Sequence, residues 1–128
     1  MLPTERVIGD SGLLVAGERV RLEIRLPWYR SLPLSTVRVE QLVLDNEEIP
    51  LEQVRFELRE LHVPLSGLED LTDCFWFVLD SAFLSFPERI EPGSEHRVSA
   101  TLSLFPPYIP GMKRTNSQSA NLVAGEVQ

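Results

Sequence analysis

Residues 96–105, HRVSATLSLF, form the most regular stretch of this 128-residue chain, and they decide its fold class. Hydrophobic and polar residues alternate without a break. Val98, Ala100, Leu102 and Leu104 fall on one side, and Arg97, Ser99, Thr101 and Ser103 on the other. A period of two residues is typical of an extended strand with one buried face and one solvated face. The stretch therefore predicts an antiparallel strand.

The same alternation recurs along the chain. Residues 18–27 (ERVRLEIRLP) and 54–60 (VRFELRE) alternate cleanly, whereas residues 35–50 change phase near Glu40 and Gln41. The phase change predicts a bulge, and Asp45-Asn46 beyond it predicts a tight turn. Pro64 confines residues 62–65 to a sheet edge. Short strands with turn signals about every 8–12 residues predict an all-β fold, a single-domain antiparallel β-sandwich over residues 1–110.

Three segments depart from this alternation. Residues 74–80 (CFWFVLD) are apolar on both faces, which predicts a strand that is central or covered, with residues 83–86 as its pairing neighbour. Residues 66–73 (SGLEDLTD) predict a short helical turn. Residues 111–128 are polar and lose the alternation, which predicts a C-terminal tail that becomes ordered only against a partner.

Composition excludes several classes of protein. The net charge of −7 disfavours a nucleic-acid binder, which needs a basic surface. No apolar run approaches the roughly 18 residues of a membrane-spanning helix. The N-terminus shows no signal-peptide pattern, and Cys74 has no second cysteine with which to pair. These features predict a soluble protein in the reducing cytoplasm.

The residue types that perform catalysis are scattered. His62 and His96 lack metal-ligand spacing and are expected to be exposed or hydrogen-bonded. Cys74 is expected to be a buried, inert thiol. Asp80 is the one acid expected in a buried place, where accepting backbone N–H groups is a more common role than acid–base chemistry. The residues therefore predict no catalytic group and no metal site in this chain.

Aromatic residues are concentrated in two proline-flanked segments. Trp28, Tyr29 and Arg30 lie between Pro27 and Pro33, and residues 105–110 read FPPYIP. Trp, Tyr and Arg are enriched at the energetic centres of protein interfaces, and prolines restrict the backbone before binding. Alternatively, bulky side chains here close the end of the sandwich. The residues alone leave both interpretations open.

Five sequence segments resemble, in order and spacing, the small β subunit of bacterial C-glycoside deglycosidases. They are LPWYRSLPLSTV (26–37), LVLDNEEIP (42–50), FWFVLD (75–80), EPGSEHRVSATLSL (91–104) and PPYIP (106–110). The resemblance covers residues 18–110. Asp45-Asn46-Glu47 stands where the family has Asp-Gly-Glu, a harmless change because Asn also accepts a positive φ. Beyond residue 110 the family pattern cannot be followed.

The resemblance implies a non-catalytic β subunit of a carbon–carbon lyase. The α subunit would be a TIM barrel with a divalent metal, expected to be Mn²⁺. It would cleave the bond between a 3-keto sugar and an aromatic aglycone such as a flavonoid by β-elimination, because the ketone acidifies the proton at C2. The resemblance also implies that Trp28, Tyr29, Arg30, Tyr108 and Ile109 bury against the α subunit, with Arg30 pairing with a carboxylate there.

Two other functions remain open at this stage. A stand-alone carbohydrate-binding β-sandwich would stack sugars on exposed Trp and Tyr rings, and its isolated chain would bind saccharides. An independent enzyme would use Asp80 or Glu48 with a bound metal, and it would turn over substrate without a second subunit. A sandwich fold by itself is compatible with all three.

Overall fold

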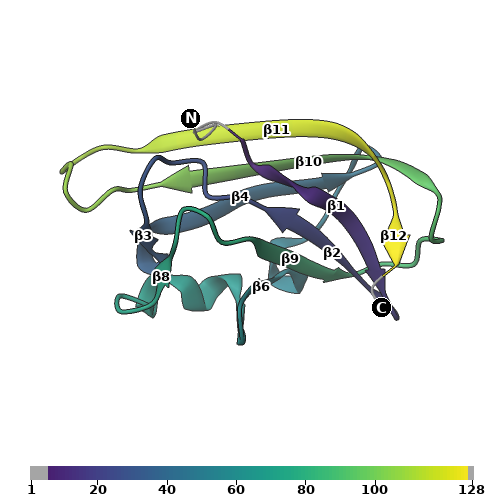
Figure 1. Cartoon of the computed structure of the whole chain (residues 1–128), viewed down its shortest axis with the longest axis horizontal. Coiled ribbons are helices and arrows are strands. Elements are labelled where there is room, and N and C mark those ends of the chain that lie inside the picture. The colour runs from purple at the N-terminus through teal and green to yellow at the C-terminus, as the bar shows by residue number, and fades with distance from the viewer. Residues whose placement is uncertain (1–5, 127–128) are drawn as a thin grey trace.

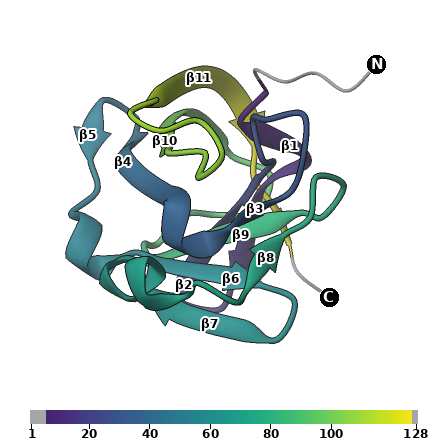
Figure 2. The same cartoon turned by 90° about the vertical axis from the view of Figure 1, so that its left-hand side faces the viewer.

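Two sheets face each other across an apolar core in the computed structural model of the protein, which describes residues 6–126 (Figures 1 and 2). The strands are β1 (Ile8–Ala16), β2 (Arg19–Ile24), β3 (Leu32–Pro33), β4 (Val37–Leu44), β5 (Glu47–Glu48), β6 (Arg55–Leu58), β7 (Leu61–Pro64), β8 (Phe75–Trp76), β9 (Ala82–Pro87), β10 (Glu95–Leu104), β11 (Arg114–Val123) and β12 (Gly125–Glu126). Three 3₁₀ turns join them: η1 (Leu34–Thr36), η2 (Leu51–Gln53) and η3 (Leu65–Asp70). The predicted all-β sandwich is confirmed, and η3 is the helical turn expected near residue 66.

One sheet has six strands in the order β12-β1-β2-β9-β6-β7, and the other has four in the order β11-β10-β4-β5. A third, two-stranded sheet pairs β3 with β8 at one end of the sandwich (Figure 1). Neighbouring strands are antiparallel except β1 and β12, which are parallel. As predicted from Pro64, β7 lies at a sheet edge.

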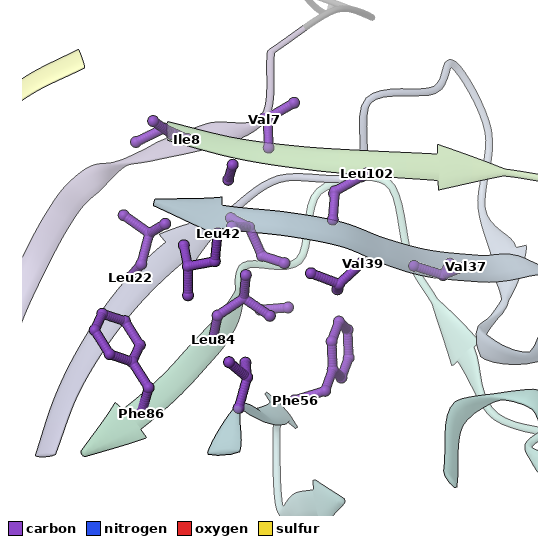
Figure 3. Close-up of a cluster of buried hydrophobic side chains, with 14 of the residues drawn as sticks. Val7, Ile8, Leu22, Val37, Val39, Leu42, Phe56, Leu84, Phe86 and Leu102 are labelled. Atoms are coloured by element: carbon purple, nitrogen blue, oxygen red, sulfur yellow. The ribbon is translucent and has the colours of Figure 1, made fainter. Parts of the chain in front are cut away.

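The core lies between the two sheets (Figure 3). Leu102, Val39 and Leu42 project from the four-stranded sheet toward Leu84 and Phe56 of the six-stranded sheet. The side chains that the alternation of residues 96–105 places inward are all fully buried. Burial of a Val or Leu side chain contributes roughly 1.5–3 kcal/mol to the free energy of folding, so the alternation marks the residues whose burial favours the folded state.

The predicted bulge lies in the middle of β4, and the predicted turn directly follows the end of that strand. Val39 is paired with Leu102 and Gln41 with Thr101, so Glu40 is the extra residue. Asp45 and Asn46 then adopt φ values of 52° and 70°. Positive φ at both central residues is the geometry of a two-residue hairpin turn, which Asn and Asp tolerate better than most residues.

One acid on the polar side of β2 is unexpectedly buried. Glu23 packs against Gly9, and its carboxylate accepts a hydrogen bond from the backbone N–H of Ser11 at 2.7 Å. The β1–β2 ladder is irregular between Ile8 and Leu13, which leaves the Ser11 N–H without a ladder partner. The carboxylate supplies the missing acceptor, so its burial is compensated.

The prediction of a polar tail over residues 111–128 is wrong for residues 114–126. Arg114–Val123 pair with all ten residues of β10, and Gly125–Glu126 pair with β1; residues 127 and 128 lie outside the described part. The inward side of β11 is polar in its first half, where Gln118 binds backbone groups near the start of β1, whereas Ala120 and Leu122 pack against the core. The Gln118 carboxamide oxygen accepts the backbone N–H groups of Val7 and Ile8 at 2.9 and 2.8 Å. A strand with such an inward face shows no hydrophobic alternation.

The prediction that residues 74–80 form one strand paired with residues 83–86 is also wrong. Only Phe75 and Trp76 form a strand, paired with β3, and the chain then turns at residues 78–79. The supposed neighbour at residues 83–86 lies in β9, between β2 and β6. Trp76 is fully buried, but Phe75, Phe77 and Leu79 are exposed. One face of the segment packs into this chain's core, and its other, equally apolar face lies at the surface.

Candidate partner-binding surface

Trp28 packs inside the sandwich, in contrast to its predicted place in a partner interface. Its side chain is 6% exposed. The indole N–H donates a hydrogen bond to the Tyr108 hydroxyl at 2.5 Å, and the ring lies 5.0 Å from the ring of Tyr29. For Trp28, the alternative interpretation, a bulky side chain that closes the end of the sandwich, is the one that holds.

The other four predicted residues lie together on the surface, at the end of the sandwich that Figure 2 faces. Tyr29 is 53% exposed, and Arg30, Tyr108 and Ile109 are exposed beside it. The Arg30 guanidinium lies 4.6 Å from the centre of the Tyr108 ring. The hydroxyls of Tyr29 and Tyr108 are 3.5 Å apart, and this contact raises the pKa of Tyr29 above its ordinary value. We call these four residues the tyrosine rim.

Arg30 carries a charge for which residues 6–126 provide no carboxylate partner within ion-pair distance. Arg38, Arg59 and Lys113, at the same end, each have an acidic partner: Glu69, Asp80 and Glu40 respectively. An exposed guanidinium stacked on an aromatic ring is well placed to accept a carboxylate in bidentate geometry.

Asp80 is not the buried acid that the sequence predicted. Its side chain is 37% exposed and forms an ion pair with Arg59 at 2.5 Å. Arg59 also donates to the carbonyl oxygen of Phe75 at 3.0 Å and lies over the ring of Phe77. Asp80 therefore fixes an arginine that holds the 74–80 segment. Cys74, expected to be buried, is half-buried in the wall of a pocket next to this arginine.

Ser94, His96 and Asp45 form a hydrogen-bonded row. The imidazole nitrogens of His96 lie 2.7 Å from the Ser94 hydroxyl and 2.6 Å from an Asp45 carboxylate oxygen. The Ser94 hydroxyl donates its proton to the carbonyl oxygen of Glu91 at 2.5 Å. A serine nucleophile must instead give its proton to the histidine. The row therefore links the turn at residues 45–46 to the turn at residues 91–94.

The histidine predictions are confirmed for both residues. His96 is hydrogen-bonded, and its contact with Asp45, assisted by the backbone N–H of Arg97, lowers the pKa of that carboxyl group. His62 is exposed on β7 and lies 3.4 Å from Glu57. Within residues 6–126, no group of three His, Cys, Asp or Glu side chains is arranged to hold a metal ion. The same residues include no helix long and apolar enough to cross a membrane.

The fold and this surface define a β-sandwich protein whose exposed aromatic side chains gather at one end. The family model of the C-glycoside deglycosidase beta subunit matches residues 16–108. A C-glycoside deglycosidase beta subunit of Microbacterium trichothecenolyticum is 38% identical over 85% of this chain and 82% of its own length. A 3′-dehydrocarminate deglycosidase beta subunit of a Microbacterium species is 35% identical over 83% and 80% respectively. A C-glycoside deglycosidase beta subunit of Arthrobacter globiformis is 34% identical over 82% and 81%. This chain belongs to the C-glycoside deglycosidase beta subunit family, as its resemblance to that family had indicated.

Proposed function

We propose that this chain is the non-catalytic β subunit of a C-glycoside deglycosidase built from two different subunits. The observation that carries the proposal is the family membership, which extends over most of this chain and most of each relative. A β subunit works with a second subunit, and we propose that this partner is a TIM-barrel α subunit that holds a divalent metal, Mn²⁺, and the catalytic groups. The surface described above supports a binding role for the present chain.

The proposed reaction of the assembled enzyme is cleavage of the carbon–carbon bond between a 3-keto sugar and an aromatic aglycone. A ketone at C3 acidifies the neighbouring C2 proton; when that proton is removed, a C1=C2 double bond forms, the bond from C1 to the aglycone breaks, and the aglycone carbon takes up a proton as it leaves. The name 3′-dehydrocarminate deglycosidase, given to one relative, refers to a glycoside oxidised at position 3′ of the sugar. We propose oxidised C-glycosides of flavonoid-like aglycones as the substrate class here.

The tyrosine rim supplies this chain's part of the interface in the proposal. Tyr29, Tyr108 and Ile109 offer apolar area, and Arg30 offers a charge for a carboxylate of the α subunit. Trp28 contributes from inside, because its hydrogen bond fixes the hydroxyl of Tyr108. Burial of the rim would then brace the α subunit without adding a reacting group.

The proposal is tested by reconstitution with the proposed α subunit, sought among the barrel proteins encoded in the same genome. The two chains should co-elute on a sizing column at low micromolar concentration. The pair should cleave a 3-keto C-glycoside in the presence of Mn²⁺, and this chain alone should not. Separate elution of the two proteins, together with full activity of the barrel protein alone, would contradict the proposal.

The carbohydrate-binding alternative has one observation in its favour, the exposed Tyr29 and Tyr108 rings. Aromatic rings of this kind can stack against sugars in binding modules. The two functions differ in what the isolated chain binds. Calorimetric titration of the isolated chain with oligosaccharides should give no heat of binding if the chain is an enzyme subunit, and saturable heat if it is a carbohydrate-binding module.

A further inference from the structure

The segment 74–80, which we call the Phe77 loop, presents a second apolar surface. Phe75, Phe77 and Leu79 point outward, and Leu79 is the most exposed large hydrophobic residue in the described part of the chain, at 67%. Between them, Trp76 points into the core and is fully buried. Three large side chains exposed at alternate positions are a patch, and patches on soluble proteins mark binding surfaces more often than scattered residues do.

The backbone of the Phe77 loop is fixed by hydrogen bonds. The Trp76 indole N–H donates to the carbonyl oxygen of Asp80 at 2.9 Å, and the Asp80 N–H donates to the carbonyl oxygen of Phe77 at 2.9 Å. The Val78 N–H donates to the Ser31 hydroxyl at 3.0 Å. A loop held in this way exposes its apolar side chains in one geometry, so ordering it costs little entropy on binding.

A pocket opens beside the loop. It has a volume of about 500 Å³ and is lined by Leu58, Leu61, Cys74, Phe75 and Phe77, together with three charged residues, Arg59, Glu60 and Asp73. The arginine is fixed by Asp80, as described above. The apolar walls and this volume suit a large apolar side chain inserted from a second protein, and the charged residues border it.

The Phe77 loop is continuous with the tyrosine rim. The hydroxyl of Ser31 accepts the hydrogen bond from the Val78 N–H, and Ser31 directly follows Arg30 in the sequence. Seven of the eight exposed large hydrophobic residues of the described chain lie in the loops at this end: Tyr29, Phe75, Phe77, Leu79, Phe105, Tyr108 and Ile109. The eighth, Val123, lies at the opposite end of the sandwich, where β11 ends (Figure 1).

Several aromatic rings at the same end of the sandwich form cation–π contacts. Arg59 lies 5.3 Å from the ring of Phe77, and Arg38 and Lys113 lie 5.9 and 5.8 Å from that of Phe105. With Arg30 on Tyr108, four of the five such contacts of the described chain occur here, although the protein is acidic overall. Because Arg38, Arg59 and Lys113 already have acidic partners in this chain, Arg30 is the cation of this end that can pair with a carboxylate of a second protein.

We propose that the Phe77 loop and its pocket form a second contact with the α subunit, continuous with the tyrosine rim, and that the pocket receives an apolar side chain of that subunit. This inference rests on the proposed function, because it assigns the same partner to both surfaces. It adds Phe75, Phe77 and Leu79 to the interface, and it predicts that the partner surface carries an apolar side chain opposite the pocket and a carboxylate opposite Arg30.

The test measures the affinity of the full chain for the α subunit from the same genome by calorimetry. A Phe77→Ser/Leu79→Ser variant should bind at least tenfold more weakly than the wild type, and Leu79→Ser alone should bind measurably more weakly. Val123→Ser is the matched control, since Val123 is 61% exposed at the far end, and it should bind like the wild type. Melting curves identify any variant that fails to fold. If the double variant does not fold, the affinity of Leu79→Ser, at the most exposed position, decides whether the loop binds the α subunit.

The failures of the two proposals are distinguishable. Suppose that both Phe77-loop variants fold and bind with wild-type affinity, while Tyr29→Ala/Ile109→Ala binds more weakly. This result would overturn the present inference and leave the proposed function standing. A wild-type chain that does not bind the α subunit would overturn both. Equal weakening by Val123→Ser would also overturn the inference, because the effect would not be specific to this end.

Discussion

The indole nitrogen of Trp28 and the hydroxyl of Tyr108 are 2.5 Å apart, although 80 residues separate them in the sequence. Trp28 is buried and Tyr108 is 41% exposed, so this hydrogen bond joins the core to the surface that we propose the partner covers. It also explains how two proline-flanked loops from distant parts of the chain form one rim. The rim is a continuation of the core rather than a pair of independent loops.

Tyr108→Phe should destabilise the protein, because the buried indole N–H loses its acceptor. The expected cost is about 1 kcal/mol in the free energy of unfolding. For a domain of this size the melting temperature should fall by about 4 °C. Tyr29→Phe is the matched control, since that hydroxyl contacts only exposed groups, Tyr108 at 3.5 Å and the side chain of Arg30, and its melting temperature should stay within about 1 °C of the wild type. Equal shifts for the two variants would contradict the role given to the Trp28 hydrogen bond.

Asp45→Asn should destabilise the protein in a way that depends on pH. Hydrogen bonds from His96 and from the backbone N–H of Arg97 lower the pKa of Asp45 below its ordinary value of 3.8. An acid whose pKa is lower in the folded state stabilises that state above its unfolded pKa, and the contribution is lost as the pH falls through the folded pKa. Melting temperatures of wild type and variant should therefore differ at pH 6 and converge below about pH 3. A difference that stays constant over this range would contradict the assignment.

Gly9→Ala should destabilise the protein because a Cβ atom at Gly9 would overlap the buried carboxylate of Glu23. Overpacking of this kind costs typically about 1–3 kcal/mol. Gly67→Ala is the matched control. Its added Cβ would make only ordinary contacts, at 3.8 Å or more, and Gly67 lies in the 3₁₀ turn η3. Urea unfolding should show a lower midpoint for Gly9→Ala alone, and equal midpoints would show that the Glu23 side chain moves aside freely.

Asp80→Asn should leave the chemistry of the assembled enzyme intact. Asp80 binds Arg59, and both side chains are partly exposed, so loss of the ion pair should cost no more than about 1 kcal/mol of stability. With the α subunit at saturating concentration, kcat for a 3-keto C-glycoside should stay within twofold of the wild type. A folded, α-bound Asp80→Asn chain with no turnover would instead support a catalytic role for this carboxylate.

The sequence predicted those parts of the fold whose signal is local. Residues 96–105 alternate because their strand lies in the middle of its sheet with one face on the core, and the turn at Asp45-Asn46 needs the positive φ that these residue types allow. Strand β11 was missed because its inward face uses Gln118 to bind the backbone at Val7 and Ile8. Such a contact joins residues more than a hundred positions apart and leaves no periodic pattern.

Part of the candidate surface could also be predicted. Tyr29, Arg30, Tyr108 and Ile109 are exposed as expected, whereas Trp28 is not, because composition cannot say which ring of an adjacent pair points inward. For the Phe77 loop, the prediction of a central strand paired with residues 83–86 is wrong. A run that is apolar on both faces fits a central strand and a surface loop covered by a second protein equally well. Only the pairing of β9 with β2 and β6 decides between the two.

The central claim is that the tyrosine rim is covered by a second protein. Its most direct test is sedimentation velocity of the Tyr29→Ala/Ile109→Ala variant mixed with the α subunit at low micromolar concentration. Both side chains are exposed, so the variant should fold with an unchanged melting temperature, unlike one that removes the buried Trp28. We predict a loss of the fast-sedimenting complex that the wild-type chain forms. A variant that sediments with the α subunit as the wild type does would contradict the claim.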